Sequence, residues 1–173
     1  MSRVEALELS DYRAAVARIY LSAADLPDFR SRRDELFATH PQSPVPTTER
    51  DTFAGLRYFA PTDDAIAEVE LREEPGSLAV DTGGPDGVIR YERVGILDTP
   101  WGPLSLWWIA AYGGGLFLPV RDGTSGTDTY GGGRYVTDTV KGTHGRGVEL
   151  IGGSRVRIIQ ADAHVLQHAA PGQ

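Results

Sequence analysis

The sequence predicts an α+β fold that is mainly β, with N-terminal helices followed by an antiparallel β-meander that forms a barrel or sandwich. Two observations lead to this prediction. Up to His40, apolar side chains recur at the three- and four-residue spacing of amphipathic helices. After Asp51, short runs of β-branched, leucine or aromatic residues are separated by turn sequences such as EEPG, GGPDG and YGGG. The 21 glycines and 11 prolines fit a chain with many turns.

The N-terminal helical segment is expected at residues 8–40 and holds two predicted helices. The first is expected at residues 10–24, with Ser10 as its cap and an apolar stripe along one face. The second is expected at residues 27–39, because proline suits the first turn of a helix. The His40-Pro41 step and the prolines that follow it end this helix.

The β-rich body is expected at residues 51–161, and residues 162–173 are expected to form a frayed tail. No internal repeat or long linker divides the chain, so residues 1–173 are predicted to form a single domain. Turn residues between the apolar runs set the strand boundaries. Strands are expected at residues 65–71, 77–80, 88–97, 104–112, 116–121, 129–140, 148–151 and 155–161.

Composition excludes several function classes. With 17 Lys and Arg against 24 Asp and Glu, the net charge is −7, so no basic surface for nucleic-acid binding is expected. The absence of cysteine excludes disulfides, thiolate metal sites and cysteine nucleophiles. The charged N-terminus lacks the apolar core of a signal peptide, and no apolar run is long enough to span a membrane. We therefore expect a soluble, cytoplasmic protein without membrane contacts, and the single lysine, Lys141, among many arginines suggests a GC-rich bacterial genome.

The densest group of polar residues lies at residues 121–135, in the sequence RDGTSGTDTYGGGRY. If its second half is a strand, Tyr130, Gly132 and Arg134 share one face, and Arg134 can present its guanidinium to a carboxylate or phosphate. The alternative is a tight hairpin, in which Asp122 accepts turn amides and Arg134 forms an internal ion pair. The candidate ligand-binding residues in this group are Thr124, Thr129, Tyr130, Arg134 and Tyr135.

A second candidate group lies at the end of the second predicted helix. Phe29, Arg33, Phe37 and His40 fall on one helical face, at spacings of four, four and three residues. An arginine and a histidine on an apolar face need partners when that face packs against the body. The pair either forms one wall of a ligand site, or it is structural, with His40 capping the helix and Arg33 bound to a carboxylate of the sheet.

Recognised catalytic and metal-binding motifs are absent. His164 and His168 have the spacing of two metal ligands on a helix, but no third ligand accompanies them, so no metal site is expected. The sequence contains no Walker loop, no Gly-x-Ser-x-Gly motif and no dinucleotide-binding motif. Cofactor and reaction class therefore stay open.

Four segments together resemble a known family: RRDELFATHPQSP, FAGLRYF, LSLWWIAAYGGGLFLPVRDGTSG and TYGGGRYVTDTVKG. Their combined pattern, from about residue 29 to about residue 142, is similar to an uncharacterised prokaryotic family, domain of unknown function sixteen-eighty-four. The resemblance implies a β-rich fold and no established activity. Members of that family usually continue into Asp-Phe-Asn, Ala-Tyr-Asn-Pro, a cysteine-containing stretch and a proline-rich end, whereas residues 148–173 contain none of these. A site that uses that ending would be missing here.

The leading hypothesis is a small-molecule-binding β-domain whose site lies between the N-terminal helix and the DGTSG and GGGRY sequences. In it Arg134 binds an anionic small molecule, and His40 and Asp122 are the candidate catalytic residues, with acid–base or orienting roles. Whether the protein is an enzyme is left open. The alternatives are a structural or protein-interaction module without activity, and a degenerate member of the family.

Overall fold

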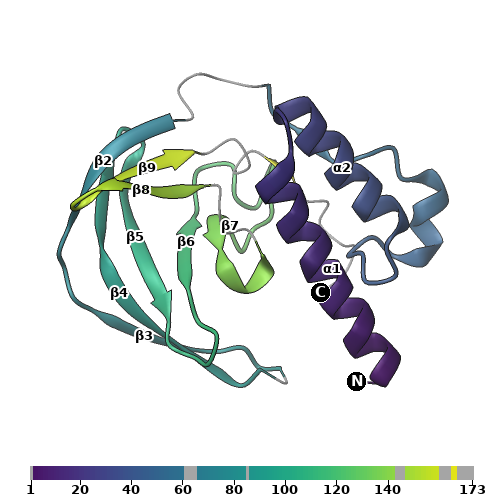
Figure 1. Ribbon diagram of the computed structural model, residues 1–173, viewed down its shortest axis with the longest axis horizontal. Helices are drawn as coiled ribbons and strands as arrows, with labels where there is room; N and C mark the ends of the chain where they lie inside the picture. Colours follow the sequence, from purple (N-terminus) through teal and green to yellow (C-terminus); the bar gives the residue numbers. More distant parts are fainter. Residues whose placement is uncertain (1, 61–65, 85, 143–146, 160–164, 167–173) are drawn as a thin grey trace.

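The computed structural model describes residues 2–60, 66–84, 86–142, 147–159 and 165–166. It places two N-terminal helices beside a curled antiparallel sheet (Figure 1). The first helix, α1 (Arg3–Ser22), begins well before the predicted start at Ser10. The reason is a capping box: Glu5 N–H donates to Ser2 Oγ at 3.1 Å, and the Glu5 carboxylate accepts from Ser2 N–H at 2.5 Å.

The second helix, α2 (Leu26–Thr39), lies where the proline near its start predicts it. Its N-cap is Asp25, whose Oδ1 accepts a hydrogen bond from Asp28 N–H at 2.8 Å. The two helices pack through a small core of their own, in which the Tyr20 and Phe29 rings meet edge to face at 5.0 Å between centroids.

Most of the predicted strands are present, with ends that lie within three residues of the prediction. The 3₁₀ helix η1 (Thr47–Thr52) connects α2 to the first strand, β1 (Arg57–Tyr58). The sheet strands before the polar segment are β2 (Ile66–Arg72), β3 (Ser77–Asp81), β4 (Val88–Thr99), β5 (Gly102–Ile109) and β6 (Leu116–Val120). After it come β7 (Arg134–Asp138), the 3₁₀ helix η3 (Thr139–Lys141), β8 (Val148–Gly152), β9 (Arg155–Ile159) and β10 (Val165–Leu166).

All pairings between named strands are antiparallel. The eight-stranded sheet has the order β7-β6-β5-β4-β2-β9-β8, with β3 also paired to β4. The strands from β3 to β7 therefore form the predicted meander, whereas β2 pairs with β9 from the end of the chain. Along one edge of the long strand β4, the first half pairs with β3 and the second half pairs with β2.

The sheet curls into a half-barrel around an apolar core (Figure 1). The first and last strands of this order, β7 and β8, lie close to each other. A Cβ added at Gly147, just before β8, would lie 2.5 Å from the carbonyl oxygen of Val136 in β7. The residues buried inside the curl are Leu97, Leu106, Leu118, Val136, Val156 and Ile158. The predicted fold class, α+β and mainly β, is confirmed.

The predicted strand at residues 129–140 is wrong at both ends. The predicted strand at residues 129–140 shrinks to β7, because the Gly133 N–H donates to the Tyr130 carbonyl at 3.0 Å and closes a turn where strand alternation was expected. The end of the predicted strand is the 3₁₀ helix η3. In the tail predicted to be frayed, β10 pairs with β1, and the rest of that tail lies outside the described residues.

Within the part of the chain that the structure describes, no helix is long and apolar enough to cross a membrane.

Candidate functional site

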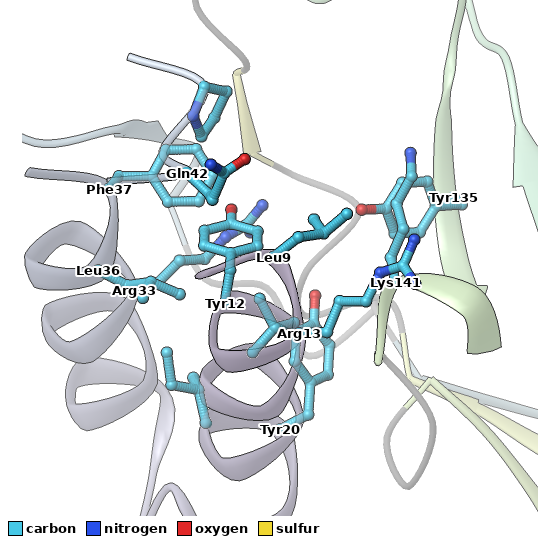
Figure 2. A pocket seen from close by; sticks show the side chains of 13 residues that line it. Leu9, Tyr12, Arg13, Tyr20, Arg33, Leu36, Phe37, Gln42, Tyr135 and Lys141 are labelled. Carbon is cyan, nitrogen blue, oxygen red and sulfur yellow. The ribbon is translucent and has the colours of Figure 1, made fainter. Parts of the chain in front are cut away.

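A pocket of about 410 Å³ lies where the two helices meet β7 and η3 (Figure 2). One wall comes from α1, a second from α2 and the loop that follows it, and a third from Tyr135 of β7 and Lys141 at the end of η3. Leu9, Val16 and Leu36 are among the apolar side chains that line it. The volume is within the range of sites that hold small molecules, roughly 300–1,000 Å³.

The loop after α2 is held back against the helices, and the HPQSP sequence explains how. Ser43 Oγ donates to the Phe37 carbonyl of α2 and accepts from Val45 N–H at 3.1 Å. Gln42 Nε2 donates to Glu8 Oε2 of α1 at 3.1 Å. These bonds place Gln42 and Pro44 at the pocket wall.

The third wall depends on the close packing of η3 on α1. Asp138 caps η3 by accepting from the Val140 and Lys141 N–H groups, and Gly142 ends it with a φ of +77°. A Cβ at Gly142 would lie 3.0 Å from the Arg13 carbonyl oxygen. Glycine is therefore the residue that fits both the backbone conformation and this approach, which brings Lys141 next to α1.

Among the described residues, the charged side chains that line the pocket are all cations: Arg13, Arg33 and Lys141. The Arg33 guanidinium carbon lies 5.4 Å from the centroid of the Phe37 ring, and Lys141 Nζ lies 4.7 Å from that of Tyr135. Lys141 Nζ is also 3.8 Å from Asp138 Oδ2, so its charge is partly compensated. In a chain of net charge −7, the pocket thus gathers positive charge.

Tyr12 contributes a neutral hydroxyl group to the same pocket. Burial raises the pKa of Tyr12 above its usual value, although the positive charge of Arg33 works in the opposite direction. The phenol therefore stays protonated at neutral pH and can donate a hydrogen bond to an anion. The hydroxyl-bearing rings of Tyr20 and Tyr135 line the pocket as well.

His40 lies beside the pocket and has a structural role at the end of α2. Its backbone N–H donates to the Leu36 carbonyl, and its Nδ1 accepts from Gln42 N–H at 3.0 Å. Because Nδ1 is an acceptor, the ring proton is on Nε2, which lies 3.4 Å from Asp11 Oδ2. The His40 ring meets Tyr12 edge to face, but His40 does not line the cavity.

The polar group at residues 121–135 is a separate cluster from the pocket, apart from Tyr135. Asp122 Oδ1 accepts from Thr124 N–H at 2.9 Å and from Thr124 Oγ1 at 2.6 Å, and Thr124 Oγ1 lies 3.0 Å from Thr129 Oγ1. Arg134 Nη2 donates to Asp122 Oδ2. The hairpin with an internal ion pair, the alternative that the sequence left open, describes this geometry.

The Asp122–Arg134 pair is unequally buried. The Arg134 side chain is 7% exposed and that of Asp122 is 52% exposed. Arg134 Nε and Nη1 are buried and make no hydrogen bond with the described residues. Burial by itself would raise the pKa of Asp122, but hydrogen bonds from Thr124 and the charge of Arg134 outweigh it and hold the pKa below its usual value.

The structure therefore divides the sequence-predicted site residues. It brings Arg33 and Tyr135 together in the pocket and places Thr124, Thr129 and Arg134 with Asp122 in the hairpin. Tyr130 is half-exposed on the surface. The polar residues of the pocket that the sequence did not indicate as site residues are Tyr12, Arg13, Tyr20 and Lys141.

The sequence contains partial indications for two of these residues, Tyr12 and Lys141. Tyr12 is on the apolar stripe of the first predicted helix, where an aromatic residue indicates core packing as readily as a site. Lys141, as the only lysine, was noticeable, but nothing in the local sequence connects it with Arg13.

No three His, Asp or Glu side chains within the described ranges are grouped so that they could hold a metal ion. His164 and His168 lie outside those ranges.

The protein is therefore a mainly β domain with an N-terminal helix pair. The helix pair, β7 and η3 together line a small pocket. A family model described as "Protein of unknown function (DUF1684)" matches residues 51–151, and the chain belongs to this family. The resemblance inferred from the sequence motifs is thereby confirmed.

One solved relative is an uncharacterized protein from gene locus rrnAC0354 of Haloarcula marismortui, determined by solution NMR. It is 32% identical, and the match covers 81% of this chain and 74% of that one with a TM-score of 0.47. No curated protein matches the chain.

Proposed function

We propose that the protein binds a small anionic molecule in the pocket between α1, α2 and the β7–η3 segment. The observation that supports this most directly is the charge of the lining, since its charged side chains within the described part of the chain are Arg13, Arg33 and Lys141. Hydrogen bonding to an anion by guanidinium and ammonium groups is stronger than between neutral partners. The neutral Tyr12 hydroxyl adds a donor, and the apolar walls can bury the rest of the ligand.

Of the residues predicted from sequence, this proposal keeps Arg33 and Tyr135. The hairpin residues Asp122 and Arg134 are assigned a structural role, because their charged groups bind each other. His40 is assigned the role of holding the loop after α2, through its bond with Gln42.

The test is a thermal-shift screen of the purified protein against inorganic phosphate, linear and aromatic carboxylates and phosphorylated metabolites. A ligand at a hundred times its Kd stabilises the folded state by about 2.7 kcal/mol. For a domain of this size that corresponds to a rise in Tm of roughly 5–11 °C.

The variants are Arg33→Gln and Arg13→Gln, with Arg90→Gln as the matched control. Arg90 is an exposed arginine on β4, outside the pocket, so its substitution changes the net charge equally. We expect the shift to fall in the two pocket variants and to persist in the control. If no anion raises the Tm, or if all three variants respond like the wild type, the proposal is wrong.

A further inference from the structure

The strand β3 (Ser77–Asp81) lies at an open edge of the eight-stranded sheet (Figure 1). Within the described part of the chain it pairs with β4 and with no other strand. All five of its residues are exposed, so this edge is open to solvent. The five include no proline or lysine, the residues that commonly keep an edge strand from pairing with another chain, and the register with β4 contains no bulge.

Two backbone hydrogen bonds that flank β3 show which of its groups point toward β4. Arg93 N–H donates to the Gly76 carbonyl at 2.7 Å, and Thr82 N–H donates to the Gly87 carbonyl at 3.0 Å. Backbone direction alternates along a strand, so the even-numbered residues between Gly76 and Thr82 also point their N–H and carbonyl groups toward β4. The odd-numbered residues point theirs toward the open edge. These residues are Ser77, Ala79 and Asp81.

The outward backbone groups match those of a second copy of the same strand. When two β3 strands run antiparallel about a two-fold axis at Ala79, this residue faces its own copy, and Ser77 faces Asp81 of the second copy. Every outward N–H and carbonyl group of the strand then has a partner, and no like charges face each other. A shift of the axis by one residue would place Ser77 or Asp81 opposite a residue outside the strand.

The apolar side chains of β3 favour the same arrangement. Leu78 and Val80 are 47% and 41% exposed and lie on one face of the sheet. They extend a stripe of apolar side chains, since Leu78 pairs with Tyr91, whose ring lies 5.6 Å from that of Phe117 between centroids. With the axis at Ala79, Leu78 faces Val80 of the second copy on the same side of the sheet. The two stripes then join, and exposed apolar surface is removed from water.

We propose that the chain forms a homodimer through β3, in which two copies pair antiparallel about Ala79 and continue one sheet across both subunits. Both copies contribute the same strand, so the contact is two-fold symmetric and closed. Because only five residues of each copy form the strand pair, we expect a weak dimer with a Kd of about 10–100 μM. The inference does not depend on anion binding, since β3 contributes no residue to the pocket.

Disulfide cross-linking tests the register, because the chain contains no cysteine. Residues that exchange both hydrogen bonds in an antiparallel pair have Cα atoms about 5.5 Å apart, and a disulfide spans about 4.4–6.8 Å. Ala79→Cys should therefore cross-link to its own copy under mild oxidation. Ser77→Cys is the matched control, because its two copies would lie about 13 Å apart along the strands and should stay monomeric on a non-reducing gel.

Sedimentation velocity at protein concentrations from about 5 to about 500 μM measures association without a cross-link. We expect the mass of the wild type to rise from that of a monomer toward that of a dimer. Ala79→Pro removes an N–H that points to the open edge, and Val80→Lys places a charge opposite Leu78 of the second copy. Each should weaken dimerisation by at least about tenfold. Leu7→Lys, at a 73% exposed position on α1, is the control and should associate like the wild type.

The inference is supported by selective cross-linking of Ala79→Cys together with reversible dimerisation of the wild type. It is wrong if the wild type stays monomeric over the whole concentration range, or if Ser77→Cys cross-links as readily as Ala79→Cys. It is also wrong if Ala79→Pro and Val80→Lys associate like the wild type while circular dichroism shows them folded. Each of these results leaves the proposed anion binding untouched.

Discussion

Asp122 and Arg134 form an ion pair in which only the arginine is buried, and this asymmetry predicts different consequences for two single substitutions. Asp122→Asn leaves a guanidinium that is 7% exposed without its carboxylate. Arg134→Met removes the buried charge, keeps most of the apolar stem, and leaves a carboxylate that water reaches. Only the first change leaves an uncompensated charge in the interior.

The size of the effect follows from the exposure of the pair. Breaking a fully buried ion pair costs about 3–5 kcal/mol, and breaking an exposed one costs about 0–1 kcal/mol. Because Asp122 is 52% exposed, we expect Asp122→Asn to lower the free energy of unfolding by about 2 kcal/mol. Arg134→Met should change it by less than about 1 kcal/mol, since Nε and Nη1 of this arginine are already buried and make no hydrogen bond with the described residues.

The assay is thermal and urea unfolding of the wild type and both variants at neutral pH. A loss of about 2 kcal/mol should lower the Tm by roughly 4–8 °C in a domain of this size. Asp86→Asn, at an exposed position in the β3–β4 loop, is the control for the change in net charge. A larger loss in Arg134→Met than in Asp122→Asn, or no loss in Asp122→Asn, would refute the reasoning from burial.

Two further predictions follow from the same structure. The pKa of Asp122 is lower in the folded protein than its usual value near 3.9, so its stabilising contribution is present above about pH 4 and is lost as the pH falls through the folded-state pKa. The difference in urea midpoint between wild type and Asp122→Asn should therefore shrink in acid, and a difference that stays constant down to about pH 2 would contradict this. Gly142→Ala should lower the Tm more than Gly83→Ala, because both have a positive φ, but only at Gly142 does the new Cβ meet a backbone oxygen. Equal losses would show that the contact with α1 is not tight.

The helices and most strands were predictable because their signals are local. The proline near the start of α2 and the spacing of its apolar residues determine that helix without reference to the rest of the chain. The earlier start of α1 depends on two reciprocal hydrogen bonds between Ser2 and Glu5, which are also a local feature. The prediction started the helix at Ser10 because the apolar stripe is clear only after that residue. In the GGGRY sequence, strand alternation and a turn were both compatible with the residues present, and the bond from Gly133 to Tyr130 decides for the turn.

The candidate site was predictable only in part. Arg33 and Tyr135 were identified as polar groups next to apolar or small residues, and both line the pocket. The hairpin residues were identified by the same criterion, yet they satisfy one another, because the turn brings Asp122 next to Arg134. Sequence alone does not distinguish a polar group that is available to a ligand from one that already has a partner.

The sequence by itself determined the fold class, the approximate limits of the helices and strands, and the family, since these depend on periodicity, turn residues and short motifs. Only the tertiary structure decided where a ligand can bind. Arg13 and Arg33 come from the two consecutive N-terminal helices, and Lys141 comes from η3 in the second half of the chain. They line one cavity because α1 packs on α2 and Gly142 lets η3 approach α1. Such contacts depend on side-chain packing between distant segments, and no local pattern of residues encodes them.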